Sequence, residues 1–232
     1  MTHKKGMSSI QIAIDGPAGS GKSTIAKILA DHLGFIYIDT GAMYRAVTLL
    51  SGETGIPYDD EEKLTSLAAQ AHLQLVRSTD GKQTVLCNGR DVTAEIRSPV
   101  VNKNVSLVAS LAGVRKELVK KQQELAADQD VVMDGRDIGA VVLPKAQCKI
   151  YLTASIEERA RRRRLELSEK GYQADYETIR QELQERDWLD QHRAADPLYP
   201  SPEAVIIDTT DMNHREVVEE ILQIYRRKKD KT

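Results

Sequence analysis

Residues 16–23 read Gly-Pro-Ala-Gly-Ser-Gly-Lys-Ser, a spacing of glycines, lysine and hydroxyl that suits the binding of phosphate. Glycines let a backbone curl so that successive N–H groups face phosphate oxygens. Lys22 can reach the β- and γ-phosphates of a nucleoside triphosphate, and the Ser23 hydroxyl can bind Mg²⁺. The residues expected to surround the phosphates are Gly16, Pro17, Ala18, Gly19, Ser20, Gly21, Lys22, Ser23 and Thr24.

The flanks of this loop strengthen the prediction. An apolar run, residues 10–15, precedes it and a helical pattern, residues 24–30, follows it. Strand, glycine loop and helix are the context in which the motif binds a triphosphate. The alternative is a glycine turn that only joins a strand to a helix, and the presence of all four fixed positions of the motif disfavours it.

A second group of chemical residues follows the apolar run at residues 130–134. A hydrophobic strand that ends in a carboxylate, here Asp134, often holds Mg²⁺ directly or through water opposite a phosphate loop. Arg136 and Asp137 come next and are expected at the same edge of the sheet, where ligands bind in open parallel sheets. A strand exit closed by a salt-bridged turn is the alternative, but two acids and an arginine within four residues favour function.

Arginines gather at further positions that the pattern places near the strand ends. Arg45 falls one turn into a helix expected to start at about Ala42, and Arg115 lies near the start of another helix. Residues Arg186, Asp190 and Arg193 share one helical face by their spacing. Guanidinium groups grip phosphates in a bidentate manner, so this number of cations suits two anionic substrates held together. We therefore predict a phosphoryl transferase with a small phosphorylated acceptor.

The run at residues 155–164 carries five arginines behind Ser155, a good helix N-cap. Such a run is most often a solvated helix or a nucleic-acid patch. It is equally suited to a mobile cover that neutralises the triphosphate during transfer.

The elements that must position these residues alternate between strand and helix. The sequence predicts an α/β fold: a phosphate-loop type of parallel sheet flanked by helices, with an inserted antiparallel hairpin lobe and a short helical lid. We expect one domain over residues 10–228, the inserted lobe at about 60–112, the lid at about 157–180 and a flexible N-terminus at 1–9. Strands are expected at residues 10–15, 34–39, 72–77, 83–87, 130–134, 149–153 and 204–208, and helices at 24–30, 42–50, 59–71, 99–112, 114–127, 176–193 and 213–227.

Composition narrows the class of protein. The 232 residues carry a net charge of −2 and only 4% aromatic residues, which argues against a nucleic-acid partner and a base-stacking platform. The two cysteines, Cys87 and Cys148, lie in apolar runs and have no metal-site spacing, so buried free thiols in a reducing cytoplasm are expected. The N-terminus shows neither a signal peptide nor a membrane span. No long exposed apolar stripe is evident, which favours a monomer.

Several segments of the chain closely resemble the bacterial cytidylate kinases. They are residues 13–24, 39–45, 134–139 and 150–154, together with Arg186-Asp187 followed by Asp190, Arg193 and Pro197-Leu198. The resemblance extends from about residue 10 to 224. Asp-Thr-Gly-Ala-Met-Tyr-Arg and Gly-Arg-Asp-Ile-Gly are not general features of phosphate-loop kinases. Trp188-Leu189 and Gln191-His192 depart from the charged or polar residues that are frequent in relatives.

The resemblance implies a reaction and a set of roles. Members of that family transfer the γ-phosphoryl group of ATP to CMP or dCMP with Mg²⁺. By position, Ser106, Arg115 and Asp137 are implied at the cytosine, and Arg45 and Arg136 at the acceptor phosphate. The implied groups at the ribose and phosphates are Arg186, Asp190 and Arg193. Thr40 is expected beside CMP, Arg162 of the lid beside ATP, and Lys22, Asp134, Arg136 and Arg186 are the expected catalytic residues.

Two alternatives remain open from the residues alone. The first is a kinase for another small acceptor such as AMP, UMP or shikimate. The second is a nucleotide-dependent RNA- or DNA-binding protein that uses the arginine run, which predicts salt-sensitive binding and hydrolysis without an acceptor.

Overall fold

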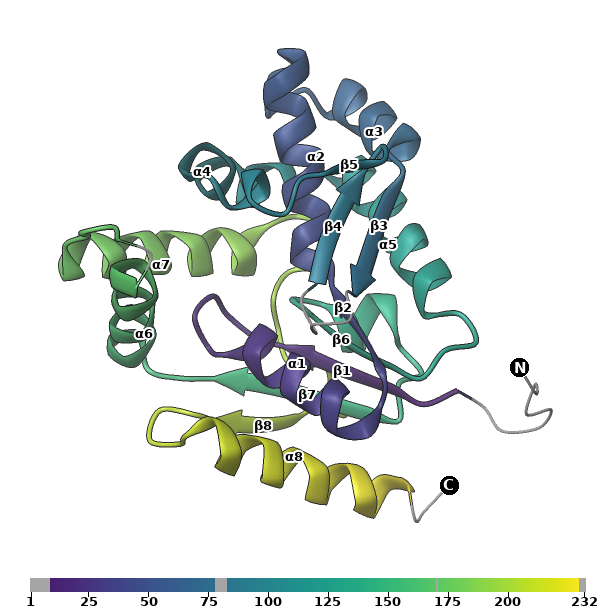
Figure 1. The fold of residues 1–232 in the computed structure, drawn as a ribbon, viewed down its shortest axis with the longest axis vertical. Helices are drawn as coiled ribbons and strands as arrows, with labels where there is room; N and C mark the ends of the chain where they lie inside the picture. The colour runs from purple at the N-terminus through teal and green to yellow at the C-terminus, as the bar shows by residue number, and fades with distance from the viewer. Residues whose placement is uncertain (1–8, 78–82, 170, 230–232) are drawn as a thin grey trace.

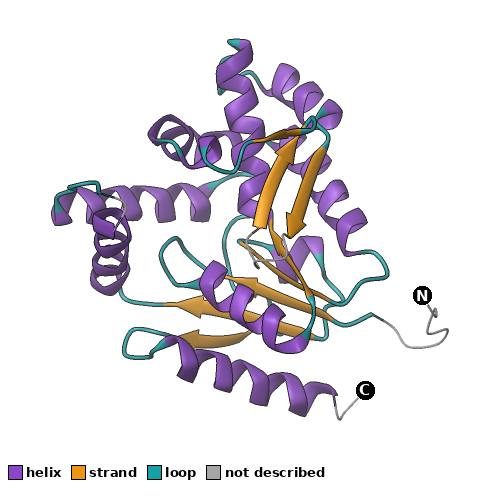
Figure 2. Cartoon of the chain, in the orientation of Figure 1, coloured by secondary structure: helices purple, strands orange, loops and turns teal. Residues whose placement is uncertain are grey.

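Five parallel strands form the main sheet of the protein. The computed structural model describes residues 9–77, 83–169 and 171–229. The strand order is β2-β6-β1-β7-β8, and all four pairings are parallel. The expected fold class is confirmed (Figures 1 and 2). The strands are β1 (Gln11–Asp15), β2 (Ile36–Asp39), β6 (Val131–Gly135), β7 (Cys148–Thr153) and β8 (Val205–Asp208).

The register of the sheet brings its acidic strand ends together. Asp39 of β2 pairs with Asp134 of β6, and Asp15 of β1 pairs with Gly135. Val131, Val132 and Met133 are fully buried, as expected for a central strand covered on both faces. The polar residue at the end of each apolar run is therefore placed at one common edge.

Helices cover both faces of this sheet. On one face α1 (Lys22–Leu33) and α8 (His214–Lys229) pack against Ile12, Ile14 and Ile150 in one hydrophobic cluster. On the other face α5 (Ala112–Ala126) and a short π-helical turn, η2 (Ile138–Val142), pack near Ala13 and Met133. Alternate residues of β1 serve the two clusters, as the pleat of a strand requires.

A second hydrophobic cluster lies beside the main sheet, in the upper part of Figure 1. It is built by α2, α3, the antiparallel sheet β3-β4-β5, α4 and the first half of α5. The predicted hairpin is confirmed, although its turn at residues 78–82 lies outside the described residues. The bounds are α2 (Thr40–Thr54), α3 (Glu61–Gln70), β3 (Leu73–Arg77), β4 (Gln83–Cys87), β5 (Arg90–Asp91), η1 (Glu95–Arg97) and α4 (Pro99–Val108).

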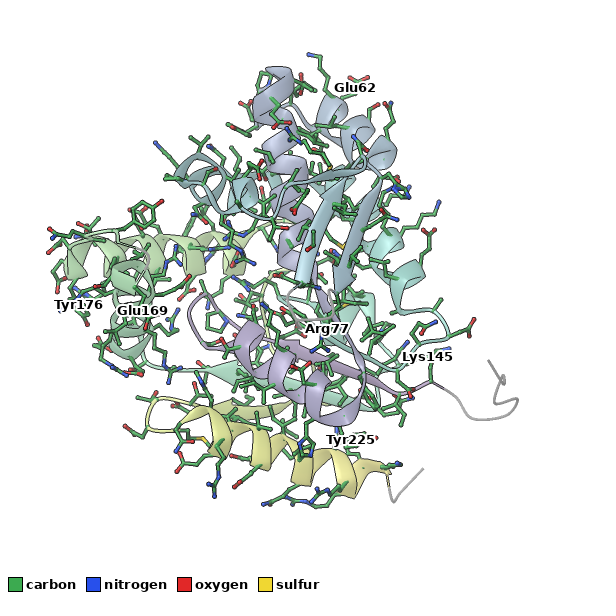
Figure 3. All side chains as sticks on the ribbon, in the orientation of Figure 1. Glu62, Arg77, Lys145, Glu169, Tyr176 and Tyr225 are labelled. Carbon is green, nitrogen blue, oxygen red and sulfur yellow. The ribbon has the colours of Figure 1, made fainter. Side chains whose placement is uncertain are left out.

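Two contacts join the end of this hairpin to the main sheet. Arg77 forms an ion pair with Asp31 of α1, and Figure 3 shows Arg77 at this junction. Gln83 Nε2 donates to the Tyr37 carbonyl of β2 at 3.2 Å. The hairpin therefore approaches the edge strand of the main sheet.

The helices α6 (Ile156–Glu169) and α7 (Tyr176–His192) lie beyond the carboxyl ends of β1 and β7 (Figure 1). Figure 3 shows Glu169 and Tyr176 at the outer end of this pair, away from the sheet. The Ser155 hydroxyl accepts from Glu158 N at 3.2 Å, so Ser155 caps α6 as predicted. The inner ends of both helices are left beside the glycine loop.

The second helix begins earlier than the sequence predicts. We expected a start at about Ala42, whereas α2 starts at Thr40. Asp39 is the N-cap, and its Oδ1 accepts from Ala42 N at 3.0 Å. Because the capping carboxylate is the last residue of β2, strand and helix join without a loop.

Both cysteines are buried free thiols, as predicted. Cys148 belongs to the cluster around α1 and α8, and Cys87 belongs to the cluster around the hairpin. Within the described residues, no helix is long and apolar enough to cross a membrane. The expected flexible N-terminus falls almost wholly on residues 1–8, outside the described part.

Candidate active site

The lysine of the glycine loop is hydrogen-bonded to other residues of the same loop. Lys22 begins α1, and its Nζ donates to the Pro17 carbonyl at 2.6 Å and to Ser20 Oγ at 3.4 Å. Burial lowers the pKa of Lys22, and the charges of Arg136 and Arg186 lower it further. An anion bound where this lysine and the start of α1 point would favour the charged form of Lys22.

Asp134 faces the loop from the end of β6. Its Oδ2 accepts from Ser23 Oγ at 2.8 Å, and its Oδ1 accepts from the Tyr37 hydroxyl at 2.7 Å. Burial and then the neighbouring Asp39 raise the pKa of Asp134 to about 6. A cation at this carboxylate would favour its ionised form.

The Ser23 and Asp134 oxygens suit Mg²⁺. The described residues contain no group of three or more His, Cys, Asp or Glu that could hold a metal by themselves. Mg²⁺ in phosphate-transfer sites usually takes one or two protein oxygens, with phosphate and water oxygens as its remaining ligands. The donor set therefore fits a magnesium ion that arrives with a nucleotide.

Thr40 supports this strand end. The Thr40 hydroxyl donates to the Asp134 carbonyl at 2.7 Å and is buried. This contact fixes the start of α2 to the end of β6, so the hydroxyl is already engaged when no ligand is bound.

Three of the predicted arginines surround a region next to the loop. Arg136 Nε donates to Asp190 Oδ2 at 2.7 Å, and Arg45 Nη1 donates to Asn102 Oδ1 at 2.5 Å. Burial and then Arg186 lower the pKa of Arg45 to about 9. Burial and then Arg136 lower the pKa of Arg186 to about 10. Arg45 and Arg186 are each destabilised as cations by burial and by another cation, so the region is suited to an anion. For Arg136, burial is outweighed by Asp190, and the pKa is raised.

Arg186 is the most incompletely bonded of the three. Its Nε is buried and has no hydrogen-bond partner among the described residues. A buried donor without a partner carries a desolvation cost that a phosphate oxygen would remove.

A carboxylate that pairs with two arginines follows shortly after the end of β6. Asp137 is buried and forms ion pairs with Arg115 and, at 3.3 Å, with Arg193. Arg115 Nε also donates to Asp196 Oδ2 at 2.9 Å, and its guanidinium lies 5.8 Å from the centre of the Tyr44 ring. The ion pairs therefore hold one carboxylate and two guanidinium groups in place in the protein interior.

Ser106 lies apart from this cluster in its bonding. It is half-buried on α4, and its hydroxyl has no hydrogen-bond partner within the described part of the chain. The structure therefore joins Arg115, Asp137 and Arg193 directly and leaves Ser106 unbonded.

The arginine run of α6 is divided between different environments. Arg161 and Arg162 pair with Glu158, and Arg163 pairs with Glu166. Arg159 is buried, unlike the side chains of a fully solvated helix. Arg162 Nη1 donates to Thr209 Oγ1 at 3.0 Å and lies near Gly21 of the glycine loop.

Several side chains at the site were missed by sequence reasoning. Tyr37, Asn102 and Asp196 each bond a predicted site residue, and Asp39 pairs with Arg97 at 3.2 Å. The sequence pattern indicates Asp15 only as the end of a strand, yet its carboxylate accepts from two backbone N–H groups of η2. Of these, only the acids carried a usable signal, since they end apolar runs or follow a helix.

A glycine loop that shares one sheet edge with a strand-end carboxylate and a desolvated group of arginines is the arrangement of the phosphate-loop kinases. These enzymes hold a triphosphate and its acceptor side by side. The family model for cytidylate kinase matches residues 12–227 of this chain. The chain therefore belongs to the cytidylate kinase family, as the resemblance predicted.

Curated relatives cover almost the whole chain. A cytidylate kinase of Desulforamulus reducens is 54% identical over 211 residues, which are 91% of this chain and 94% of the relative. A cytidylate kinase of Bacillus licheniformis is 51% identical over 220 residues, which are 95% and 97% of the two chains. The fold is similar to the crystal structure of an uncharacterized protein from Eubacterium ventriosum, with a TM-score of 0.50, 13% identity and coverage of 94% of this chain and 99% of that chain.

Proposed function

We propose that the protein transfers the γ-phosphoryl group of ATP to CMP and dCMP, giving CDP and dCDP, in pyrimidine nucleotide metabolism. The observation that carries the proposal is the buried carboxylate of Asp137 between Arg115 and Arg193, one step from an arginine region beside the glycine loop. In this proposal, the position that recognises the base, the position that binds the acceptor phosphate and the position that binds the ATP phosphates follow one another along the edge of the sheet.

Cytosine matches the chemistry of the Asp137 position. Its exocyclic amine is a donor that a carboxylate accepts, and its O2 and N3 accept from Arg115 or Ser106. Uracil presents a carbonyl oxygen where cytosine has the amine, so the carboxylate would face another acceptor. This supports a preference for CMP over UMP.

The phosphates are assigned by charge. Lys22, Ser23 and the amides of residues 16–24 would hold the ATP phosphates, and Arg162 would add a lid contact. Arg45, Arg136 and Arg186 would hold the acceptor phosphate. Asp190, which pairs with Arg136, and Arg193 would engage the ribose. Thr40 would support the end of β6 beneath CMP.

The chain's own residues would align and shield the reaction. Mg²⁺, held by Ser23 and by Asp134 through water, would neutralise charge on the ATP phosphates. The CMP phosphate is largely ionised at neutral pH, so Asp134 need not remove a proton. Closure of the inserted lobe at about 60–112 and of the lid at about 157–180 would bring the phosphates in line and exclude water.

We further propose a monomer that acts in the reducing cytoplasm. All the assigned groups come from one chain, and both thiols are free. A nucleic-acid role for the α6 run is disfavoured because Arg159, Arg161, Arg162 and Arg163 are each paired with an acid.

A steady-state assay with ATP and Mg²⁺ across nucleoside monophosphates tests the proposal. We expect CMP and dCMP to be phosphorylated, with AMP and UMP at least about tenfold poorer in kcat/KM, the discrimination of one polar base contact. ATP turnover that is equally fast with and without CMP would refute the assignment.

A further inference from the structure

Arg159, the first arginine of the α6 run, makes three hydrogen bonds in the protein interior. Its Nε donates to the Ala154 carbonyl at 3.0 Å. Its Nη1 donates to the Ala18 carbonyl at 3.1 Å and to Asp187 Oδ2 at 2.6 Å. The side chain is 8% exposed, so it is not available to a substrate as the rest of the run would be.

The bond to Ala18 fixes the orientation of a peptide unit in the glycine loop. In a trans peptide the carbonyl and the following N–H point in opposite directions. With the Ala18 carbonyl held by Arg159, the N–H of Gly19 must point away from α6. Phosphate binding by such a loop depends on the direction of its N–H groups.

Close packing accompanies this bond. A Cβ at Gly19 would lie 3.2 Å from the Cβ of Arg159, so the loop and the helix pack closely at this glycine. Ala18 also shares a hydrophobic cluster with Ala160 of α6 and with Ile179 and Leu183 of α7. The tip of the glycine loop is therefore seated on both helices.

Asp187 links the contact between the glycine loop and the two helices to the proposed acceptor site. It lies on α7 between Arg186 and Asp190, the two residues of that helix assigned to the acceptor site. Asp190 in turn accepts from Arg136 at 2.7 Å. A continuous series of bonds thus leads from Ala18 through Arg159, Asp187 and α7 to Arg136.

We propose that Arg159 and Asp187 form a positioning pair that sets α7 at a fixed distance from the glycine loop, so that the ATP and acceptor phosphates meet at reactive separation. The proposal rests on the proposed function. Neither residue touches a phosphate in this scheme. Misplacement of reacting groups by about 1 Å can cost roughly a hundredfold in rate, so loss of the pair should act on kcat more than on binding.

The test uses steady-state kinetics of the full chain, with calorimetric binding of CMP and of a non-hydrolysable ATP analogue. For Asp187→Ala we expect kcat to fall about tenfold to a hundredfold while both KM values stay within about threefold. Asp187→Asn keeps an acceptor oxygen for Arg159 but loses the charge, so it should recover about a third to a half of the lost rate on a logarithmic scale. Arg159→Met should also raise KM for ATP, because it releases the Ala18 carbonyl.

The pair is expected to act as a unit. The double variant Arg159→Met with Asp187→Ala should then be no slower than Arg159→Met alone. The matched control is Glu177→Ala, which removes a carboxylate from the same helix and breaks its surface pair with Arg180. Its kcat should stay within about twofold of wild type.

Three results would overturn the proposal: a kcat of Asp187→Ala within twofold of wild type, a raised KM for CMP with unchanged kcat, or additive losses in the double variant. If Asp187→Ala does not give folded protein by circular dichroism, Asp187→Asn and Arg159→Lys decide the question. Each must then lower kcat at least threefold at an unchanged KM for CMP, and a smaller loss counts against the pair. A wild type inactive on CMP refutes the proposed function instead.

Discussion

Arg136 forms an ion pair with Asp190. After burial, the charge of Arg136 is also the largest cause that lowers the pKa of Lys22 in the glycine loop. Replacement by alanine should raise KM for CMP and lower kcat, because a guanidinium contact to a phosphate is lost and Asp190 is left without its partner. A loss of about 2–4 kcal/mol in transition-state stabilisation, or roughly 30-fold to 1000-fold in kcat/KM for CMP, is expected. ATP affinity should change little, as measured by calorimetry with the ATP analogue.

Arg226→Ala, on the exposed end of α8, is the matched control for Arg136→Ala. Arg226→Ala should leave kcat, the KM for CMP and the affinity for the ATP analogue unchanged. An equal loss of ATP and CMP binding in Arg136→Ala would contradict the assignment of this residue to the acceptor.

Asp137 should determine the choice of base. Asp137→Asn replaces the acceptor for the cytosine amine and removes the counter-ion of Arg115 and Arg193. We expect a loss of about 1–3 kcal/mol in transition-state stabilisation for CMP, or roughly fivefold to 150-fold in kcat/KM, and a smaller fall for UMP. The ratio of the two specificity constants checks this; an unchanged ratio would remove Asp137 from base recognition.

The sequence indicates which residue types form the candidate site better than it indicates which residues pair with one another there. The glycine motif and the acid that ends an apolar run pointed to Lys22 and Asp134 because each motif is local in the chain. The Arg115–Asp196 and Arg159–Asp187 pairs join residues 81 and 28 positions apart, and no local pattern specifies such partners. Tyr37 lies in a short strand where an aromatic residue normally indicates only packing.

At the scale of elements, α3 and α5 pack at a glycine. A Cβ on Gly113 would lie 2.1 Å from Thr65 Oγ1 and 3.2 Å from Thr65 Cβ. Gly113→Ala should therefore destabilise the protein by about 1–3 kcal/mol, as overpacking does. Thermal or urea unfolding measures the effect.

Thr65→Ala provides the matched rescue. Because it removes the atom that clashes most closely, the double variant should recover at least half of the lost stability. Equal stabilities of Gly113→Ala and wild type would mean that α3 and α5 move apart freely.

Asp15 joins β1 to η2, and its pH dependence has a definite sign. Its carboxylate accepts from Ile138 N at 2.7 Å and Gly139 N at 2.8 Å. Burial raises the pKa of Asp15 from 3.8 to about 6 despite these bonds. The folded state therefore favours the protonated form, and this contribution to stability is present below pH 3.8 and is lost as the pH rises through about 6.

Wild type should accordingly lose stability relative to Asp15→Asn as the pH rises from about 4 to about 6. At 1.36 kcal/mol per pKa unit the full difference is about 3 kcal/mol. Chemical unfolding at several pH values measures it, and Asp59→Asn, at an exposed acid, should show no such trend. A constant difference between wild type and Asp15→Asn would contradict the raised pKa.

The element order was predictable because apolar runs alternate with amphipathic ones. The strand expected at 130–134 is Val131–Gly135, and the hairpin strands agree to within a residue. The short π-helical turn after Asp137 was not predicted, since it depends on Asp15, which is far away in the chain. Periodicity also identified which face of α7 is polar without revealing which residues of the glycine loop it meets.

At the scale of the whole molecule, buried cations lower the stability of the protein without ligand. Burial and then Arg136 lower the pKa of Arg186 from 12.5 to about 10, so Arg186 stays charged at neutral pH and its charge lowers the stability of the folded state. Arg186→Met should remove up to about 3 kcal/mol of this cost at 1.36 kcal/mol per pKa unit. We expect the ligand-free Tm to rise by about 2–6 °C and CMP binding to be lost.

Differential scanning calorimetry with and without CMP tests the effect of Arg186→Met. Arg226→Met, which removes an exposed cation, should leave the ligand-free Tm nearly unchanged. A fall in the Tm of Arg186→Met would show that this arginine stabilises the fold instead of being strained by it.

The two buried thiols make two of the hydrophobic clusters separately observable, the one around α1 and α8 and the one around the hairpin. Burial raises the pKa of both thiols, that of Cys148 to about 11, so alkylation must wait for the surrounding side chains to open. Each of these two clusters thus contains one native thiol that can report on its opening. Peptide mass spectrometry should find that CMP slows the labelling of Cys87 more than that of Cys148.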